Sequence, residues 1–260
     1  MDIPDVKRNG FSTRDRPSSD CSTMIPGTLR GAASLRRAGD RRPDRHPCRG
    51  KPWAEITSID LSESSLARAE ERVRISGAGN VTFLQADICA HPFRDGSIDH
   101  AFVCFVLGHL PEPALALASL HRVLRPGGTI TVIEGDHGSA YFSPDSRAAG
   151  KAISCLVALE RDKGGNALIG RELYPLLSRA GFREVHVSPR MVYVDSSHPE
   201  LVEGFTKQTF TAMVEGVRDE ALKRGLVGRS EWDQGIRDLY RTCEPDGTFC
   251  YTFFKGTGVK

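Results

Sequence analysis

Residues 98–107 read IDHAFVCFVL, a run that is apolar apart from two polar residues near its start. A short run that is apolar on both faces predicts a strand in the middle of a parallel sheet, covered by helices on both sides. Leucines recur at helical spacing through residues 113–124, and the sequence LRPGG at 124–128 ends that helix before a second apolar run at 129–134. This succession of strand, helix and strand predicts a βαβ unit and therefore an α/β fold.

The same alternation extends in both directions from this unit, between residue 54 and the C-terminus. Caps and glycines separate the elements; Ser62, for example, can cap a helix that Gly77 ends. Because helices separate the last two strands, we expect an antiparallel pair added to a mostly parallel, doubly wound sheet. We expect further strands at 55–59, 81–85, 185–194 and 248–254, and helices near 148–161, at 171–180 and over most of 198–242.

The composition is that of an ordinary globular enzyme or binding protein. A chain of 260 residues with 39% hydrophobic and 26% charged residues can bury a core without disulfides or metals. Its apolar runs are much shorter than the roughly 20 residues that span a bilayer, so we expect no membrane partner. Seven cysteines without a CxxC spacing, behind an N-terminus that lacks an apolar signal segment, favour a cytoplasmic location.

The first 53 residues differ from the rest of the chain. Residues 1–52 carry a net charge of +6 and six prolines, whereas the remainder carries −4. We expect a basic, disordered leader at 1–53 and one domain at 54–260 with a helical insertion at about 198–242. An arginine-rich arm could bind nucleic acid, but aspartates interrupt it and no aromatic residue is placed to stack on bases, so a solvated tail is the preferred interpretation.

Several motifs in this order resemble those of the class I, seven-stranded S-adenosylmethionine-dependent methyltransferases, whose fold is Rossmann-like. They are ITSID at 56–60, FLQAD at 83–87, the run from 98 that continues into GHL, LRPGG at 124–128 and TVIEGD at 131–136. The resemblance covers residue 54 to the C-terminus. It implies S-adenosylmethionine as the cofactor and methyl transfer to an unidentified acceptor, which we expect to be a small molecule.

The resemblance also implies a set of cofactor-binding residues at the ends of the strands. An acidic residue at the carboxyl end of the second strand can accept hydrogen bonds from both ribose hydroxyls, although the same residue could be a simple turn or cap. The implied set is Asp60 for the ribose, Leu61 for the adenine ring, Asp87 and the backbone amide of Ile88 for the adenine edge, and Cys104 and Phe105 beside the methionine part.

The acceptor side of the site is less well defined by the sequence. Methyl transfer from an activated donor needs mainly positioning, so no catalytic residue is assigned, and no motif indicates a metal. His109 is a candidate for the mouth of the site, although a lone histidine is more often structural. The resemblance implies substrate selection by the segment after the fifth strand and by the last strands and helices, which here offer Asp136, His137, Tyr141, Arg190 and Tyr193.

One motif of the family is missing. A buried first strand and a glycine-rich turn are expected about 20 to 25 residues before Asp60, because glycine allows the backbone to approach the cofactor closely. That window reads RRAGDRRPDRHPCRGKPW, so the first strand and its glycine loop are missing or replaced.

Two hypotheses follow from the missing motif. Residues 1–53 are out of frame, which translation of the upstream DNA in the other frames would test. Alternatively, the chain is a degenerate methyltransferase-fold protein that binds the cofactor weakly or not at all and acts by protein interaction. A nucleotide-dependent oxidoreductase would need GxGxxG before Asp60, and the sequence lacks it. The sequence contains no signal for an oligomeric state.

Overall fold

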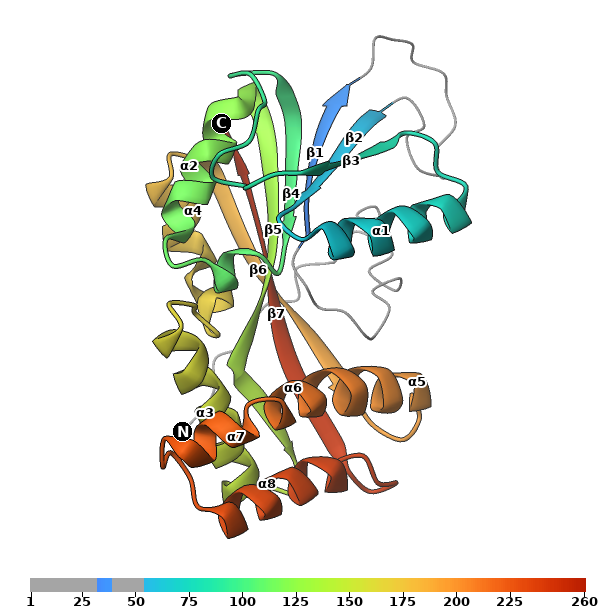
Figure 1. The fold of residues 1–260 in the computed structure, drawn as a ribbon, viewed down its shortest axis with the longest axis vertical. Coiled ribbons are helices and arrows are strands. Elements are labelled where there is room, and N and C mark those ends of the chain that lie inside the picture. Colours follow the sequence, from blue (N-terminus) through green and yellow to red (C-terminus); the bar gives the residue numbers. More distant parts are fainter. Residues whose placement is uncertain (1–31, 39–53) are drawn as a thin grey trace, which may run out of the picture.

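A computed structural model describes residues 32–38 and 54–260, which form a seven-stranded sheet in the order β3-β2-β1-β4-β5-β7-β6 with helices packed against it (Figure 1). The strands are β1 (Ala32–Ala38), β2 (Ala54–Asp60), β3 (Val81–Gln85), β4 (Ile98–Cys104), β5 (Leu124–Ser143), β6 (Arg183–Val194) and β7 (Thr248–Val259). The helices are α1 (Glu63–Ser76), α2 (Pro113–Val123), α3 (Arg147–Asp162), α4 (Leu173–Arg179), α5 (Pro199–Leu201), α6 (Ala212–Glu215), α7 (Arg218–Lys223) and α8 (Arg229–Arg241). Short turns of other helix types lie at η2 (Leu107–His109) and η3 (Ile169–Glu172), and η4 (Val202–Thr211) is a π-helix.

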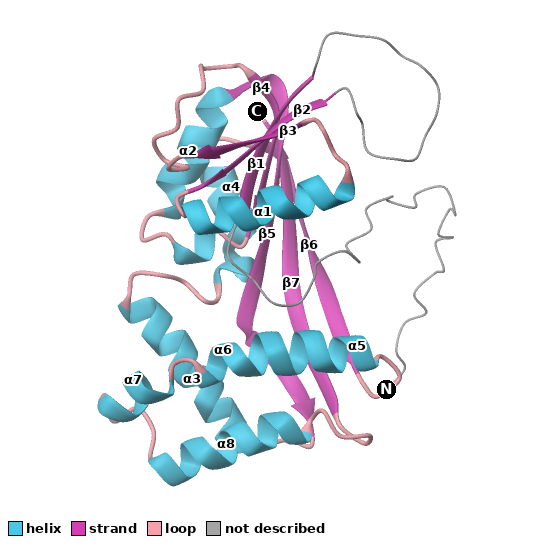
Figure 2. Ribbon diagram, turned by 45° about the vertical axis from the view of Figure 1, so that its right-hand side comes forward, coloured by secondary structure: helices cyan, strands magenta, loops and turns pink. Residues whose placement is uncertain are grey.

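The sheet is long at one side and short at the other. β5, β6 and β7 run the length of the molecule, and the short strands β1 to β4 with α1, α2 and α4 occupy one end of it (Figures 1 and 2). At the other end, α3 and the helices from α5 to α8 pack on the extensions of the long strands. The α/β fold with mixed strand directions and an antiparallel last strand is therefore confirmed, since β7 is antiparallel to both β5 and β6.

Most elements begin and end where local signals predict. Ser62 caps α1 by accepting a hydrogen bond from the backbone of Ser65 at 3.2 Å, and Gly77 ends it with a φ of +73°. The final strands are longer than expected: β5 continues past residue 134 to Ser143, and β7 continues to Val259. The extension of β5 pairs with the first half of β7, and the extension of β7 pairs with residues 129–133 of β5, so their strand structure comes from tertiary pairing rather than from local preference.

The centre of the sheet holds a strand that was not expected. β1 lies within the segment expected to be a disordered leader, and for Ala32–Ala38 that expectation was wrong. It fills the place between β2 and β4, where Ala33 and Leu35 are buried. β1 is antiparallel to both neighbours, so its first residue, Ala32, lies opposite Cys104 at the carboxyl end of β4. The rest of the expected leader, 1–31 and 39–53, lies outside the described residues.

Two apolar clusters stabilise the two ends of the molecule. The first joins the strands β1, β2, β4 and β5 to α2 and α4, and includes Leu117, Leu120 and Leu173. The second joins α3, η4, α8 and β7 around Trp232 and Phe210, both almost completely buried. Replacing a buried aromatic residue of this kind by Ala lowers the free energy of unfolding by about 3–5 kcal/mol. The cluster at the helical end therefore contributes to the stability of the molecule as the first cluster does. Within the described ranges, no helix has the length and apolar character needed to cross a membrane.

Candidate functional site

The carboxyl ends of β2, β3 and β4 lie along one edge of the sheet, which β5 crosses at Ile133. Asp60 at the end of β2 pairs with Gln85 of β3, and Cys104 at the end of β4 pairs with Ile133 of β5. Because β2 and β4 flank β1, the side chains that follow them lie two strand spacings apart, about 10 Å. In open α/β sheets this edge is where ligands bind, and the expected cofactor residues all lie along it.

Two carboxylates face this edge from neighbouring strands. Asp60 Oδ1 accepts a hydrogen bond from the backbone N–H of Ser62 at 2.7 Å, and Asp87 Oδ1 accepts one from Cys89 at 2.8 Å. Each bond fixes the turn that follows the strand and orients the carboxylate. Burial and the neighbouring Asp87 carboxylate both raise the pKa of the Cys89 thiol. Each aspartate has a second carboxylate oxygen beyond the one that holds its turn, and this oxygen can accept from a ligand.

Apolar side chains accompany these carboxylates. Leu61 is 64% exposed beside Asp60, whereas Ile88 is buried behind Asp87. Cys104 is the buried last residue of β4, and Phe105 follows it with a φ of +55°. A left-handed conformation is unfavourable for a bulky residue, and such strain concentrates at functional sites.

The described residues fit one half of S-adenosylmethionine. Asp60 and Asp87 provide two acceptors and Leu61 provides exposed apolar surface of the kind that an adenosine needs. The side chain of Ile88 is buried, so only its backbone amide is a candidate for the adenine edge. For the methionine half, glycine would allow close approach of the backbone at the end of the central strand. Among the described residues, no glycine follows the central strand β1 at this edge of the sheet. The reason is that β1 runs in the opposite direction and places its first residues at this edge.

A cavity of about 70 Å³ adjoins the other side of Phe105. It is lined by residues from the end of β4, the turn η2, β5, β7 and the helical end, and it is partly open. Its lining residues are Phe105, Gly108, His109, Glu134, Gly135, His137, Glu160, Asn166, Ala167, Ile169, Met213, Tyr251 and Phe253. Because one water needs roughly 10–15 Å³ of such space, the cavity has room for about five waters, or for a small organic group.

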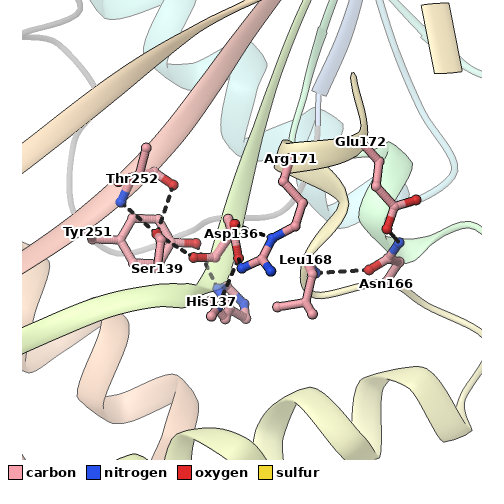
Figure 3. Close-up of polar contacts among 10 residues, drawn as sticks. Asp136, His137, Ser139, Asn166, Leu168, Arg171, Glu172, Tyr251 and Thr252 are labelled. Atoms are coloured by element: carbon pink, nitrogen blue, oxygen red, sulfur yellow. Dashed lines mark hydrogen bonds and ion pairs between the residues drawn. The ribbon is translucent and has the colours of Figure 1, made fainter. Parts of the chain in front are cut away.

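A histidine and a tyrosine are joined by a hydrogen bond in this cavity. His137 Nδ1 and Tyr251 Oη are 2.7 Å apart (Figure 3). His137 Nε2 lies 4.0 Å from Glu160 Oε2. Burial lowers the pKa of His137 to about 4 despite the nearby charge of Asp136, so the imidazole is neutral at pH 7. Burial also raises the pKa of Tyr251 well above its ordinary value, which keeps the phenol protonated.

Gly135 makes room for this pair. A Cβ at position 135 would overlap Tyr251 Oη and lie 3.3 Å from Tyr251 Cζ. On the other side of the histidine, the ring of Phe210 packs edge-on at 6.0 Å between ring centroids. Phe210 belongs to the π-helix η4, a helix type that is rare and often found at functional sites. The imidazole of His137 is therefore fixed by its hydrogen bond to Tyr251 and by its contact with the ring of Phe210.

Glu134 is a buried acid that lines the cavity. Its Oε1 accepts hydrogen bonds from the backbone N–H groups of Val106 and Leu107 at 2.9 and 2.7 Å. Burial raises its pKa to about 7, although these N–H groups and that of Gly108 act to lower it. The carboxyl group thus fixes the turn η2 that forms one wall, and it changes ionisation near neutral pH.

An ion pair between Asp136 and Arg171 fixes the backbone next to His137. Asp136 is buried, and Arg171 donates to both of its oxygens at 2.7 Å, while the backbone N–H of Gly138 donates at 3.0 Å (Figure 3). The backbone of His137 donates to the carbonyl of Ala167 at 2.9 Å. These contacts fix residues 136–138 of β5 against η3 and the loop before it.

The residues expected at the acceptor side divide into two groups. His109 and His137 line the cavity, and Asp136 supports it from beneath. Tyr141, Arg190 and Tyr193 are exposed and lie outside its lining. Sequence reasoning missed Glu134, Glu160 and Tyr251 as lining residues. The alternation of Phe249, Tyr251 and Phe253 was the available signal, since alternate residues of a strand share a face.

Among the residues that the structure describes, no group of three or more His, Cys, Asp or Glu side chains is arranged to hold a metal ion.

Comparison with known proteins finds methyltransferases among the relatives. A family model described as "Methyltransferase domain" matches residues 45–132. The demethylmenaquinone methyltransferase of Geobacillus kaustophilus is 34% identical over 163 residues, covering 56% of this chain and 68% of that protein. An "Uncharacterized 37.1 kDa protein in transposon TN4556" of Streptomyces fradiae is 34% identical over 170 residues, covering 64% of this chain but only 47% of that protein.

Similar solved structures include a putative methyltransferase from Bacillus halodurans, with a TM-score of 0.48, 18% identity and coverage of 78% of this chain and 82% of that chain. Another is phosphoethanolamine N-methyltransferase 2 of Haemonchus contortus, solved with S-adenosylhomocysteine, with a TM-score of 0.45, 18% identity and coverage of 78% and 43%.

The family assignment rests on the Geobacillus relative, because the shared sequence spans 68% of its length. The sheet order, the antiparallel last strand and the acidic residues at the ends of β2 and β3 agree with it. The chain belongs to the class I S-adenosylmethionine-dependent methyltransferases.

Proposed function

We propose that this protein transfers a methyl group from S-adenosylmethionine to a small molecule that enters the cavity beside Phe105. The observation that carries the proposal is the position of this cavity, which adjoins the strand edge where Asp60 and Asp87 offer carboxylate acceptors. An adenosine held by those carboxylates would extend along the edge toward Phe105, about two strand spacings away. Bound S-adenosylmethionine supplies a methyl group activated by its sulfonium.

The residues have separate roles in this proposal. Asp60 would bind the ribose hydroxyls, Leu61 would cover the adenine ring, and Asp87 with the amide of Ile88 would bind the adenine edge. Cys104 and Phe105 would lie against the methionine part. The neutral His137 and the carboxylate of Glu160 are candidates to take a proton from an acceptor. Glu134 also lines the cavity, but its Oε1 holds the turn η2.

The matched relatives suggest one acceptor class. The Geobacillus relative is named for demethylmenaquinone, so a quinol ring is a candidate acceptor for this chain too. The aromatic side of the cavity, with Phe105 and Phe253 at 5.3 Å between ring centroids, is compatible with a flat ring.

A second candidate function is a methyltransferase fold that no longer binds the cofactor productively and acts through protein contacts. The reversed direction of β1 favours it, because a glycine turn cannot follow the central strand at the cofactor edge. The two candidates differ in whether S-adenosylhomocysteine binds.

Calorimetric titration of the full chain with S-adenosylhomocysteine tests the proposal. We expect saturable binding, and we expect Asp60→Asn to weaken it roughly tenfold to a hundredfold, because a hydrogen bond to a charged group contributes about 1.5–3 kcal/mol. The matched control is Glu70→Gln, an exposed acid on α1, which should bind as the parent does. Absence of binding by the parent chain would favour the second candidate. Unchanged affinity in Asp60→Asn would remove the ribose role of Asp60.

A further inference from the structure

The charges in the cavity are of one sign. Glu134 and Glu160 both line it, and among its described lining residues there is no lysine or arginine. The nearby Arg171 is bound to Asp136 in a two-bond ion pair, and Lys163, which acts to lower the pKa of Glu160, does not line the cavity. His137 and His109 do not supply a positive charge at pH 7, because burial lowers the pKa of both.

Ionised carboxylates are costly in such a place without a cation. Burial raises the pKa of Glu134 to about 7 and raises that of Glu160 as well. A cation entering the cavity would favour the ionised form of both groups and offset this cost.

Aromatic rings line the same cavity. Phe253 lies next to Phe105 and to Tyr251, with ring centroids 5.3 and 4.8 Å apart. The faces of such rings attract cations, most strongly where water is excluded. Carboxylates and aromatic rings that line one cavity form the combination that recognises an ammonium group, whereas a neutral quinol would bring no positive charge to the two acids.

We propose that the acceptor is an amine, whose ammonium group lies between Glu160 and the rings of Phe105, Tyr251 and Phe253. The Glu160 carboxylate takes one proton from this ammonium group, which frees the nitrogen lone pair to accept the methyl group while the donor leaves as a neutral thioether. This inference rests on the proposed function and names its substrate class. A cavity of about 70 Å³ takes a small ammonium group or the cationic end of a longer molecule. The choice of an amine over a quinol follows from the charges rather than from the names of the relatives.

Two probes of equal size separate charge from shape. Tetramethylammonium and tert-butanol each have five non-hydrogen atoms, and only the first carries a charge. We would titrate both into the full chain, with hydroquinone as a third probe, and follow binding by saturation-transfer NMR. We expect tetramethylammonium to bind at least tenfold more tightly than tert-butanol.

Two variants locate the binding. Glu160→Gln should weaken tetramethylammonium binding about tenfold without affecting tert-butanol. Its control is Asp162→Asn, two residues further along the chain, where the carboxylate pairs with Arg224 outside the lining. This control should bind the cation as the parent does. Circular dichroism of each variant shows whether the fold is retained.

The possible results decide the proposal. Equal affinity for the charged and neutral probes, binding of hydroquinone alone, or a Glu160→Gln variant that binds the cation normally would each overturn it. S-adenosylhomocysteine is titrated in the same samples. If it binds and the cation does not, the amine proposal fails and the methyltransferase proposal stands. If the cation binds and S-adenosylhomocysteine does not, the amine site stands and methyl transfer fails.

A further result would also overturn the proposal. If Glu160→Gln weakens the binding of S-adenosylmethionine but not that of S-adenosylhomocysteine, and tetramethylammonium does not bind, then the Glu160 carboxylate interacts with the sulfonium of the cofactor and the amine proposal is wrong.

Discussion

Replacement of Gly135 by alanine tests the geometry of the cavity. The new Cβ would overlap Tyr251 Oη and approach Tyr251 Cζ to 3.3 Å. Overpacking of this kind costs about 1–3 kcal/mol, and moving the hydroxyl away also breaks its hydrogen bond to His137, which contributes about 1 kcal/mol. We therefore expect Gly135→Ala to lower the free energy of unfolding by about 3 kcal/mol.

Removal of the tyrosine hydroxyl should relieve most of this cost. In a Tyr251→Phe background the overlapping atom is gone and only the contact at the ring carbon remains. We expect Gly135→Ala to cost about 1 kcal/mol there, which gives a coupling of about 2 kcal/mol between the two positions. Urea denaturation of the four chains, followed by circular dichroism, measures this coupling.

The matched control is Gly150→Ala in α3, where a Cβ would meet no atom within 4 Å. That substitution should stabilise the chain by about 0.5–1 kcal/mol, because alanine is the better helix former. Additive effects of Gly135→Ala and Tyr251→Phe, within about 0.5 kcal/mol, would refute the described approach of the hydroxyl to the backbone of β5.

Three further predictions concern stability. Arg171→Met leaves the buried Asp136 carboxylate without its cation and should cost about 2 kcal/mol in urea denaturation, less than for a fully buried pair because Arg171 is half exposed; no loss would contradict the pairing. The folded pKa of Glu134, about 7, exceeds that of about 4.3 in an unfolded chain, so its stabilising effect is complete below pH 4 and is lost as the pH rises through 7. Relative to Glu134→Gln, the parent should lose on the order of 3 kcal/mol between pH 4 and pH 8, and parallel pH profiles would exclude this assignment. Gly235→Ala would bring a Cβ to 2.5 Å from the carbonyl oxygen of Ala148 and separate α8 from α3, so the melting temperature should fall by several degrees; an unchanged value would argue against this helix contact.

Local signals account for the parts of the fold that the sequence predicts well. Ser62 and Gly77 mark the ends of α1 because their cap geometries depend on neighbouring residues alone. The strand β3 lies at Val81–Gln85, the range that its apolar pattern predicts. The carboxylates at the ends of β2 and β3 could be found in the same way, since a strand end and an acidic residue are both visible in the sequence.

Other parts depend on contacts between distant segments. Ala32–Ala38 has two adjacent arginines and no apolar alternation, so only its pairing with β2 and β4 gives it strand structure. The extension of β5 contains Gly135, Asp136 and Gly138, which disfavour strands in isolation. His137 and Tyr251 are far apart along the chain, and their hydrogen bond follows from the register of β5 against β7, which no local pattern indicates.

A crystal structure of the full chain with S-adenosylhomocysteine tests the central claim most directly, which is that the carboxyl edge of the sheet binds this cofactor although β1 runs in reverse. We expect the ribose hydroxyls within hydrogen-bonding distance of Asp60, the adenine beside Leu61 and Asp87, and the sulfur atom next to Phe105 and the cavity. A ligand bound elsewhere, or crystals that remain free of it at saturating concentration, would contradict the account.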